Sequence, residues 1–281
     1  MKTSRILPLA CLLAAWVANT VTASQLVDNL KAGKNQTVVV FGTSLTAGDG
    51  AKNGWVKSLD TWLDTLDPDG AAKATVINSG QSGKASRTGL SLLQSAVIAQ
   101  NPDTVFIEFS MNDAYRGPSY AATNTDYRIC LQESKNNLKS MITQIRAALP
   151  DTEIIIQTMN CIYDPDPGAA NPPATGRPQI AEFYQGYRDV YAELKSTVAN
   201  LILIDHEPTW LALRANDEAL YKSYVTDGLH PTAAGTNAVT FPAIQAALTA
   251  SAIPEPATSA TLAGGFFLRV TPLGRAARRR W

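Results

Sequence analysis

The sequence predicts a three-layer α/β/α sandwich with a five-stranded parallel sheet. Five short apolar runs alternate with longer segments in which apolar residues recur at helical spacing, which is typical of parallel strands joined by crossover helices. The clearest run, Val-Val-Val-Phe at 38–41, has the continuous hydrophobicity of a strand that is buried on both faces. Polar loops follow the predicted strands at their carboxyl ends, where open α/β sheets bind ligands.

The strand at 38–41 ends at Gly42, and a turn rich in hydroxyl groups follows it. Thr43, Ser44 and Thr46 lie where a helix begins, close to backbone N–H groups and to the positive end of a helix dipole. Three interpretations of this turn are open. Ser44 is a helix N-cap, or it is a nucleophile, or the hydroxyls form a phosphate cradle that holds FMN as in flavodoxins.

The other elements are predicted from two signals. Trp55, Leu59 and Leu66 recur at helical spacing, whereas β-branched runs bounded by Gly, Pro, Asn and Asp indicate strands. In chain order we expect a helix at 53–66, a strand at 74–78, a helix at 86–99, a strand at 104–109, a helix at 134–149, a strand at 153–157, a helix at 180–198, a strand at 201–205 and a helix at 233–248. The segment at 161–178, which is dense in Pro, Gly and Asp, predicts a surface loop that shapes a substrate cleft.

Glu108 places a charge in the third predicted strand, which should be buried on both faces. A buried carboxylate requires a partner, and Lys84 or Arg87 could supply one. We therefore expect a structural ion pair, with a catalytic carboxylate as the alternative.

The chain has only two histidines, His206 and His230. His230 follows Asp227 by three residues, so the carboxylate could accept a hydrogen bond from one ring nitrogen. The other nitrogen would then be a proton acceptor, which a serine hydroxyl needs because its own pKa makes it a poor nucleophile at neutral pH. Taken singly, Asp227 is also compatible with a turn former or helix cap, and His230 with a surface histidine.

Gly83 and Asn112 are candidate donors to an oxygen that becomes negative when an acyl carbon turns tetrahedral. Gly83 follows the second predicted strand and Asn112 follows the third. A glycine N–H can approach such an oxygen closely, and an asparagine amide adds a neutral donor. The alternatives are a left-handed turn at Gly83 and an Asx-turn at Asn112.

Four short motifs resemble the blocks of the SGNH (GDSL) hydrolase family and occur in the family's order. They are Phe-Gly-Thr-Ser-Leu at 41–45, Asn-Ser-Gly-Gln-Ser-Gly at 78–83, Ser-Met-Asn-Asp at 110–113 and Asp-Gly-Leu-His-Pro at 227–231. The resemblance covers about 38–248 and implies a flavodoxin-like sandwich. It implies Ser44 as nucleophile, His230 as general base and Asp227 as the residue that orients it. It also implies an oxyanion hole made by Gly83 N–H, the Asn112 side chain and Ser44 N–H.

The motifs depart from the family pattern at two places. Thr43 replaces the usual Asp beside the nucleophile, which could alter how this turn is braced. Ser110 and Met111 replace the glycines often found before the asparagine. Gly80 is the alternative glycine donor, and Asp113 is expected to brace its loop.

The resemblance implies a serine esterase that hydrolyses carboxylic esters through an acyl-enzyme, with no metal and no organic cofactor. The partner is a small-molecule or carbohydrate ester, and an acetyl group on carbohydrate is the leading substrate. A lipase or lysophospholipase-type esterase is one alternative. A non-catalytic carbohydrate-binding module on the same fold is another.

Both ends of the chain resemble targeting segments. Residues 1–23 predict a signal peptide, with basic residues before an apolar run and small residues at the cleavage site. Residues 254–281 resemble the PEP-CTERM sorting signal of exopolysaccharide-producing Gram-negative bacteria, and a disordered basic tail is the alternative. Because Arg269 and Pro272 interrupt its apolar stretch, we expect transient rather than stable membrane association. The hydrolase domain is then 24–253, exported to the periplasm, cell surface or extracellular matrix.

The predicted domain is mildly acidic. The chain has 24 basic and 24 acidic side chains, and the two ends hold seven of the former and one of the latter, which leaves 17 and 23. This balance gives no support to nucleic-acid binding. Cys130 and Cys161 remain, and in an oxidising compartment we expect a disulfide between them. Neither has the Cys or His spacing of a zinc site.

Overall fold

The computed structural model describes residues 24–48, 54–67, 69–70, 73–116 and 129–250. All of them belong to one compact unit, residues 22–252. The predicted signal peptide at 1–23 and the sorting tail at 254–281 lie outside the described residues. No helix within the described part of the chain combines the length and the apolar character that crossing a membrane requires.

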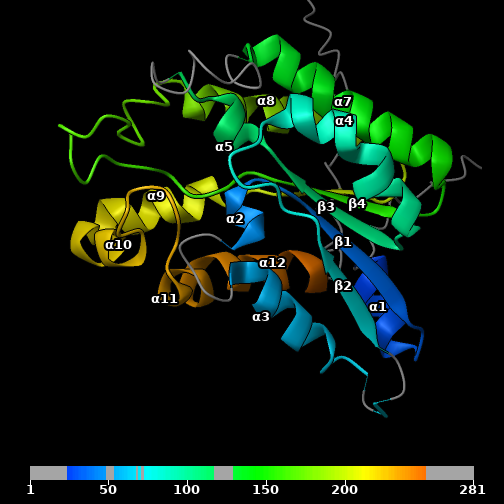
Figure 1. Ribbon diagram of the computed structural model, residues 1–281. Coiled ribbons are helices and arrows are strands. Elements are labelled where there is room, and N and C mark those ends of the chain that lie inside the picture. The colour runs from blue at the N-terminus through cyan, green and yellow to red at the C-terminus, as the bar shows by residue number, and fades with distance from the viewer. Residues whose placement is uncertain (1–23, 49–53, 68, 71–72, 117–128, 251–281) are drawn as a thin grey trace, which may run out of the picture. The chain divides into compact units, whose positions relative to one another are not determined.

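Five parallel strands form the central sheet, as the sequence predicts (Figure 1). The strands are β1 (Gln36–Gly42), β2 (Ala74–Asn78), β3 (Thr104–Glu108), β4 (Glu153–Gln157) and β5 (Leu201–Ile204). Their order in the sheet is β2-β1-β3-β4-β5, and every neighbouring pair is parallel. This is the flavodoxin-like order, in which the chain reverses direction across the sheet beside β1 and the ligand crevice lies at the carboxyl ends.

The helices comprise long crossover helices and several short ones that the sequence analysis did not predict. They are α1 (Gln25–Lys31), α2 (Ser44–Ala47), α3 (Gly54–Leu63), α4 (Ser86–Ala96), α5 (Ser110–Asp113), α7 (Leu131–Ala148), α8 (Ile180–Leu194), α9 (Glu207–Asn216), α10 (Glu218–Tyr224), α11 (Ala233–Gly235) and α12 (Phe241–Thr249). The predicted helix at 233–248 is divided, because a π-helical turn at Thr236–Thr240 separates α11 from α12. α2 and α5 are single turns, too short to show helical spacing.

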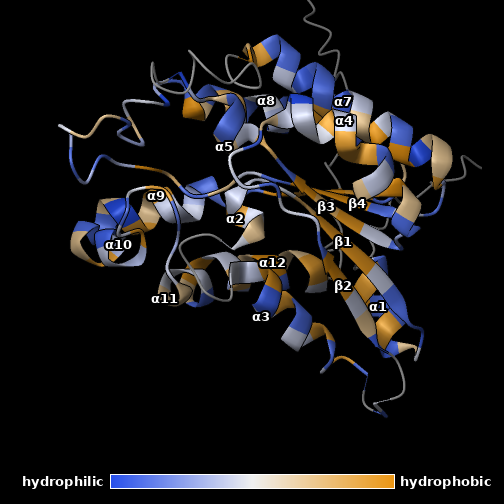
Figure 2. Ribbon diagram, in the orientation of Figure 1, coloured by the Kyte–Doolittle hydropathy of each residue, from blue (hydrophilic) through white to orange (hydrophobic). Residues whose placement is uncertain are grey.

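Two hydrophobic cores hold the layers together. α1, α3 and α12 cover one face of the sheet, and α4, α7 and α8 cover the other (Figure 1). Along β1, Val38 and Val40 enter the first core while Val39 and Phe41 enter the second. Full burial of one such side chain contributes roughly 1.5–3 kcal/mol, so both faces resist a slip in strand register. Figure 2 shows hydrophobic strands between helices whose other faces are hydrophilic.

The prediction that Glu108 forms an ion pair is wrong. Its carboxylate accepts hydrogen bonds from Thr43 N (2.6 Å), Thr43 Oγ1 (2.9 Å) and Thr46 Oγ1 (2.7 Å). Arg87 pairs instead with Glu133 at 2.7 Å, and no cation forms an ion pair with Glu108 among the described residues. The turn after β1 therefore supplies neutral donors where the sequence analysis expected a charge.

Glycine at position 42 makes this arrangement sterically feasible. Gly42 lies opposite Glu108 in the parallel register of β1 and β3. A Cβ at Gly42 would come within 2.3 Å of Glu108 Oε1 and 2.4 Å of Thr46 Oγ1. Burial raises the pKa of Glu108 to about 7, although the hydrogen bonds from Thr46 and Thr43 act in the opposite direction.

The two cysteines of the predicted disulfide are free thiols. Cys130 is exposed at the start of α7, where its Sγ accepts a hydrogen bond from Glu133 N at 3.4 Å. Cys161 is buried in a separate apolar cluster with Trp210 and Tyr221. The expected disulfide is therefore not formed, because the two side chains serve different parts of the fold.

We expect Glu108→Gln to change the pH dependence of stability. The folded-state pKa of Glu108 lies above the ordinary value of 4.5. Its favourable contribution to the free energy of unfolding is therefore complete below pH 4.5 and is lost as the pH rises through 7. The glutamine variant lacks this titration. The free energy of unfolding of the wild type, relative to the variant, should fall by about 3 kcal/mol between pH 4 and pH 8.

Urea unfolding of both proteins at a series of pH values measures this difference, and the groups shared by both cancel in it. A difference that stays constant from pH 4 to pH 8 would contradict the assigned burial and titration of Glu108.

Candidate active site

Ser44 is the first residue of α2, and its hydroxyl is held by a histidine rather than by the backbone. Thr43 caps the helix, because its Oγ1 accepts a hydrogen bond from Leu45 N at 3.3 Å. Ser44 Oγ lies 2.8 Å from His230 Nε2. The N-cap interpretation of Ser44 is therefore wrong, and its hydroxyl is free to exchange a proton with the imidazole.

Asp227 fixes the orientation of His230. Its Oδ2 lies 2.7 Å from His230 Nδ1, and its Oδ1 accepts hydrogen bonds from His230 N at 2.7 Å and Leu229 N at 2.8 Å. Partial burial acts to raise the pKa of Asp227, but the hydrogen bonds from His230 and Leu229 hold it below its usual range. The carboxylate therefore keeps the proton on Nδ1 and leaves Nε2 as the acceptor facing Ser44.

The loop that carries His230 is held by the segment that follows β4. Asn160 Nδ2 donates to Leu229 O at 2.9 Å, and Tyr163 N donates to Gly228 O at 3.1 Å. Gly228 has a φ of +78°, and a Cβ there would come within 2.2 Å of Tyr163 O. Only glycine both adopts this positive φ without strain and leaves room for Tyr163 O. The imidazole is thus placed by contacts from a different loop.

The two predicted oxyanion donors are adjacent in space. Asn112 Nδ2 donates to Lys84 O at 2.9 Å, which joins α5 to the residue after Gly83. Gly83 adopts a left-handed conformation with a φ of +71°. Its loop is tied to the end of β1, because Gln81 N donates to Gly42 O at 2.7 Å.

The alternative donor Gly80 is already engaged. Its N–H donates to Asn78 Oδ1 at 2.9 Å, and a Cβ at Gly80 would come within 2.3 Å of Ala47 N. Nδ2 of the same Asn78 amide donates to Thr46 O at 3.0 Å. Gly80 therefore packs the second motif against α2, which favours Gly83 as the oxyanion donor.

Asp113 braces its loop, as predicted. Its side chain is fully buried and accepts hydrogen bonds from Ser86 N at 2.8 Å and Ser134 Oγ at 2.5 Å. These contacts join α5 to the starts of α4 and α7. Asp113 is therefore held by neighbouring helices.

The turn after β1 does not fit a flavin phosphate. The hydroxyls of Thr43 and Thr46 donate to Glu108, so they are directed toward the interior. A carboxylate beneath the turn would also repel a phosphate when it is ionised. The chemistry of this turn instead favours a positioned serine.

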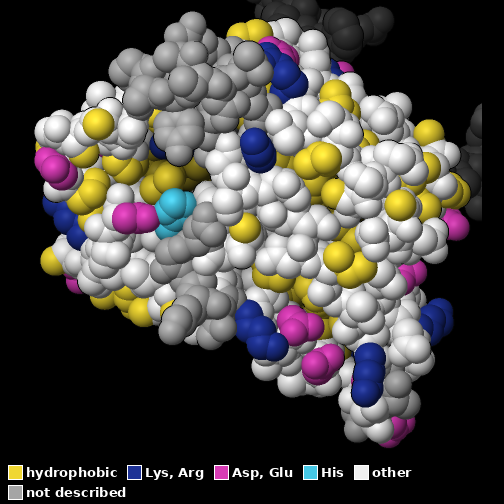
Figure 3. All heavy atoms as spheres, in the orientation of Figure 1, with side chains coloured by type: hydrophobic (Ala, Val, Ile, Leu, Met, Phe, Trp, Pro, Cys, Tyr) yellow, Lys and Arg dark blue, Asp and Glu magenta, His cyan; other side chains and the backbone are white. Residues whose placement is uncertain are grey.

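Two of the three residues, His230 and Asp227, reach the surface of the molecule. The side chain of His230 is 17% exposed and that of Asp227 is 50% exposed, whereas His206 is buried. Figure 3 shows a histidine at the surface with an acidic side chain beside it and hydrophobic side chains nearby. Ser44 is 8% exposed, so the histidine and the aspartate are the more accessible members of the triad.

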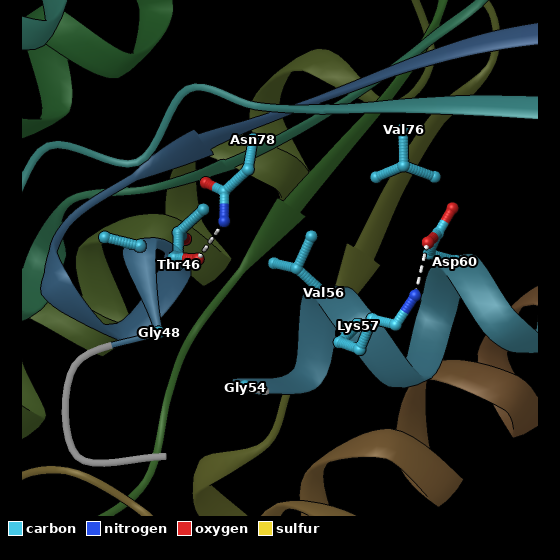
Figure 4. A pocket seen from close by; sticks show the side chains of 9 residues that line it. Thr46, Gly48, Gly54, Val56, Lys57, Asp60, Val76 and Asn78 are labelled. Carbon is cyan, nitrogen blue, oxygen red and sulfur yellow. Dashed lines mark hydrogen bonds and ion pairs between the residues drawn. The ribbon is translucent and has the colours of Figure 1, made fainter. Parts of the chain in front are cut away.

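A separate pocket of about 240 Å³ lies between α2, α3 and β2 (Figure 4). Val56 and Val76 line it together with Asn78 and an exposed ion pair between Lys57 and Asp60. Neither Ser44 nor His230 lines this pocket, so it is distinct from the triad.

Three contributing residues lay outside the candidate site predicted from the sequence. Glu108 supports the turn of Ser44, Asn160 supports the loop of His230, and Arg177 contacts Asn112. The sequence shows Glu108 as a charge in a buried strand, but it does not indicate that Thr43 and Thr46 are its partners. Arg177 lies in the loop that the sequence predicts to shape the cleft, yet no periodicity or motif indicates which residue it contacts.

Comparisons with known proteins identify the family of the chain. The model of the GDSL-like lipase/acylhydrolase family matches residues 40–238. A thioesterase 1/protease 1/lysophospholipase L1 from Escherichia coli K12 is 29% identical over 117 residues. The match covers 41% of this chain and 54% of the relative, so the chain spans about half the length of the curated relative that it matches.

Two solved structures share the fold. An acetylxylan esterase from Geobacillus stearothermophilus has a TM-score of 0.60 at 19% identity, covering 77% of this chain and 95% of that one. An alpha/beta hydrolase from the metagenome of Lake Arreo in Spain has a TM-score of 0.58 at 20% identity, covering 76% and 94%. Since the family model spans most of the chain, the protein belongs to the GDSL-like lipase/acylhydrolase family of hydrolases.

Proposed function

We propose that the protein is a serine esterase that hydrolyses carboxylic esters through an acyl-enzyme at Ser44. The observation that carries this proposal is the unbroken chain of hydrogen bonds from Ser44 Oγ through His230 to Asp227, at 2.8 Å and 2.7 Å. A hydroxyl linked to an imidazole whose tautomer is fixed by a carboxylate is an activated nucleophile.

In the first half of the reaction Ser44 Oγ attacks the acyl carbon while its proton passes to His230 Nε2. Asp227 stabilises the imidazolium that forms. The carbonyl oxygen becomes negative and receives hydrogen bonds from Asn112 Nδ2 and from the N–H groups of Gly83 and Ser44. The tetrahedral species then collapses, the bond to the alcohol oxygen breaks, and His230 gives that oxygen its proton.

In the second half water replaces the alcohol. His230 Nε2 takes a proton from the water as its oxygen attacks the acyl carbon of the ester on Ser44. Collapse of the second tetrahedral species breaks the bond to Ser44 Oγ, which recovers its proton from His230, and the carboxylic acid leaves. The side chains named here supply each proton transfer, so the proposed reaction needs neither a metal nor an organic cofactor.

The leading substrate class is a small acyl ester, in particular acetyl on carbohydrate. The acetylxylan esterase that shares the fold supports this choice. The lysophospholipase named for the Escherichia coli relative supports the second candidate, a lipolytic esterase. A non-catalytic carbohydrate-binding module would need no linked Ser44, His230 and Asp227, so the hydrogen-bond chain counts against it.

We further propose that the protein is exported and reaches the periplasm, the cell surface or the extracellular matrix of a Gram-negative bacterium. The segments at 1–23 and 254–281 support this location by their sequence alone. Transient membrane association would occur through the second segment. A sugar ester in a surface polysaccharide would be accessible to an enzyme in this location.

Replacing Ser44 with alanine should lower ester hydrolysis by at least about 10³-fold, because no other side chain then forms the acyl-enzyme. Hydrolysis of p-nitrophenyl acetate measures the rate. Labelling of the wild type with a fluorophosphonate, followed by peptide mapping, should place the label on Ser44. Equal hydrolysis by both proteins would rule out the esterase assignment and favour the binding module.

Replacing Asp227 with asparagine should lower kcat on the order of 10²–10⁴-fold, because an amide donates to Nδ1 and stabilises the wrong tautomer. Asp217→Asn is the matched control. Asp217 is an exposed cap of α10 whose Oδ1 accepts from Leu220 N at 2.9 Å, and asparagine caps helices equally well. If both variants keep full activity, Asp227 does not orient the general base.

The substrate class is tested with esters of increasing acyl length and with acetylated xylan. We expect acetate esters to be hydrolysed at least about tenfold faster than long-chain esters, and acetate to be released from the xylan. Samples of Ser44→Ala provide the blank for contaminating esterases. A preference for long chains or for lysophospholipid would favour the lipolytic candidate instead.

A further inference from the structure

We propose that Arg177 is a positioning residue that holds and polarises the Asn112 amide of the oxyanion hole. The inference rests on the proposed esterase function and adds a residue outside the four motifs. Its basis is the direct contact between the guanidinium of Arg177, from the loop before α8, and the side chain of Asn112 on α5.

Several contacts hold the Arg177 guanidinium in place. Its Nε donates to Met111 O at 2.8 Å, and its Nη1 donates to Pro173 O at 3.4 Å. The guanidinium carbon lies 4.9 Å from the centre of the Tyr115 ring, on its face. The residue is only 7% exposed. A side chain held in this way has little freedom to leave Asn112.

The contacts of Asn112 select one of the two orientations of its amide. Arg177 Nη2 lies 3.3 Å from Asn112 Oδ1, and Asn112 Nδ2 lies 2.9 Å from Lys84 O. A guanidinium can only donate hydrogen bonds and a carbonyl can only accept them. Rotation of the amide by 180° would therefore break both contacts. The observed orientation directs N–H groups, rather than an oxygen, to the side where Lys84 and Gly83 lie.

The amide group has two hydrogens on Nδ2, and Lys84 O engages one of them. The second hydrogen is then the one that the substrate oxygen uses. A positive charge at Oδ1 draws electron density toward that oxygen, which makes the Nδ2 hydrogens better donors. The same charge, buried beside the oxyanion hole, favours the negative tetrahedral species over the neutral ester.

The structure offers a matched control in Arg116. Its guanidinium also donates to backbone carbonyls, those of Asp113, Tyr115 and Ile129, and it lies 5.1 Å from the centre of the Phe183 ring. Among the described residues its hydrogen bonds go to these carbonyls and not to the Asn112 side chain. Arg116→Met should therefore reproduce the packing and stability consequences of removing an arginine without acting on the amide.

The experiment is a double-mutant cycle on the full chain. The first comparison is between Arg177→Met and the wild type. The second is between the double variant, which carries Arg177→Met and Asn112→Ala, and the single variant Asn112→Ala. In the wild-type background we expect Arg177→Met to lower kcat on the order of tenfold with KM changed less than about twofold, a smaller effect than deleting a donor. In the Asn112→Ala background the loss should be below about twofold, since the amide it acts on is gone.

Arg177→Lys tests the same inference where the methionine variant is unstable. Lysine keeps the positive charge, but it has one side-chain nitrogen where the planar guanidinium has three. The kcat of Arg177→Lys should therefore lie between those of the wild type and Arg177→Met. Arg116→Met should change kcat by the same factor in both backgrounds.

Two results would overturn the inference. One is a loss in Arg177→Met that is equally large with and without Asn112, which is the signature of a structural role. The other is a kcat unchanged in both Arg177 variants. Both leave wild-type hydrolysis intact and spare the proposed function, whereas a wild type that hydrolyses no ester overturns the function and this inference together.

Discussion

The parallel hydrogen bonding between β1 and β3 is the constraint on which the site depends. It places Gly42 opposite Glu108 at the carboxyl end of both strands. The turn after β1 then lies beside the turn after β3, so Ser44 and Asn112 reach the same edge although 68 positions separate them in the sequence. In an antiparallel pair the two strand ends would lie at opposite edges, and the two turns would not meet.

The buried carboxyl group of Glu108 joins the end of β3 to the turn after β1. Glu108 belongs to β3, but all three of its donors belong to the turn after β1. Burying a carboxyl group is costly unless its hydrogen-bonding capacity is used, and here the amide of Thr43 and two hydroxyls use it. Thr43, which replaces the family's usual aspartate, supplies two of these donors. The neutral side chain at position 43 and the acid at 108 are therefore a matched pair, since two carboxylates at this spacing would repel each other.

The sequence was sufficient to predict what is local. Three of the four motifs follow a strand, so strand periodicity predicts the edge of the sheet at which Ser44, Gly83 and Asn112 lie, whereas His230 precedes a helix and is added by the resemblance. Contacts between loops could not be predicted in the same way. Periodicity shows which face of an element is buried, but it does not show which loop crosses another. The ion pair expected for Glu108 does not form for this reason, because the partners of the carboxylate are a backbone amide and two hydroxyl groups rather than a charged side chain.

The loop between β4 and α8 shows why a family's motifs do not describe the whole site. Near its start, Asn160 and Tyr163 hold the backbone on which His230 is mounted. Near its end, Arg177 contacts Asn112. One segment therefore braces both the proposed proton acceptor and the proposed oxyanion donor. A change in this loop would therefore move His230 and Asn112 together. The motifs supply these two side chains, and the loop sets their placement relative to each other.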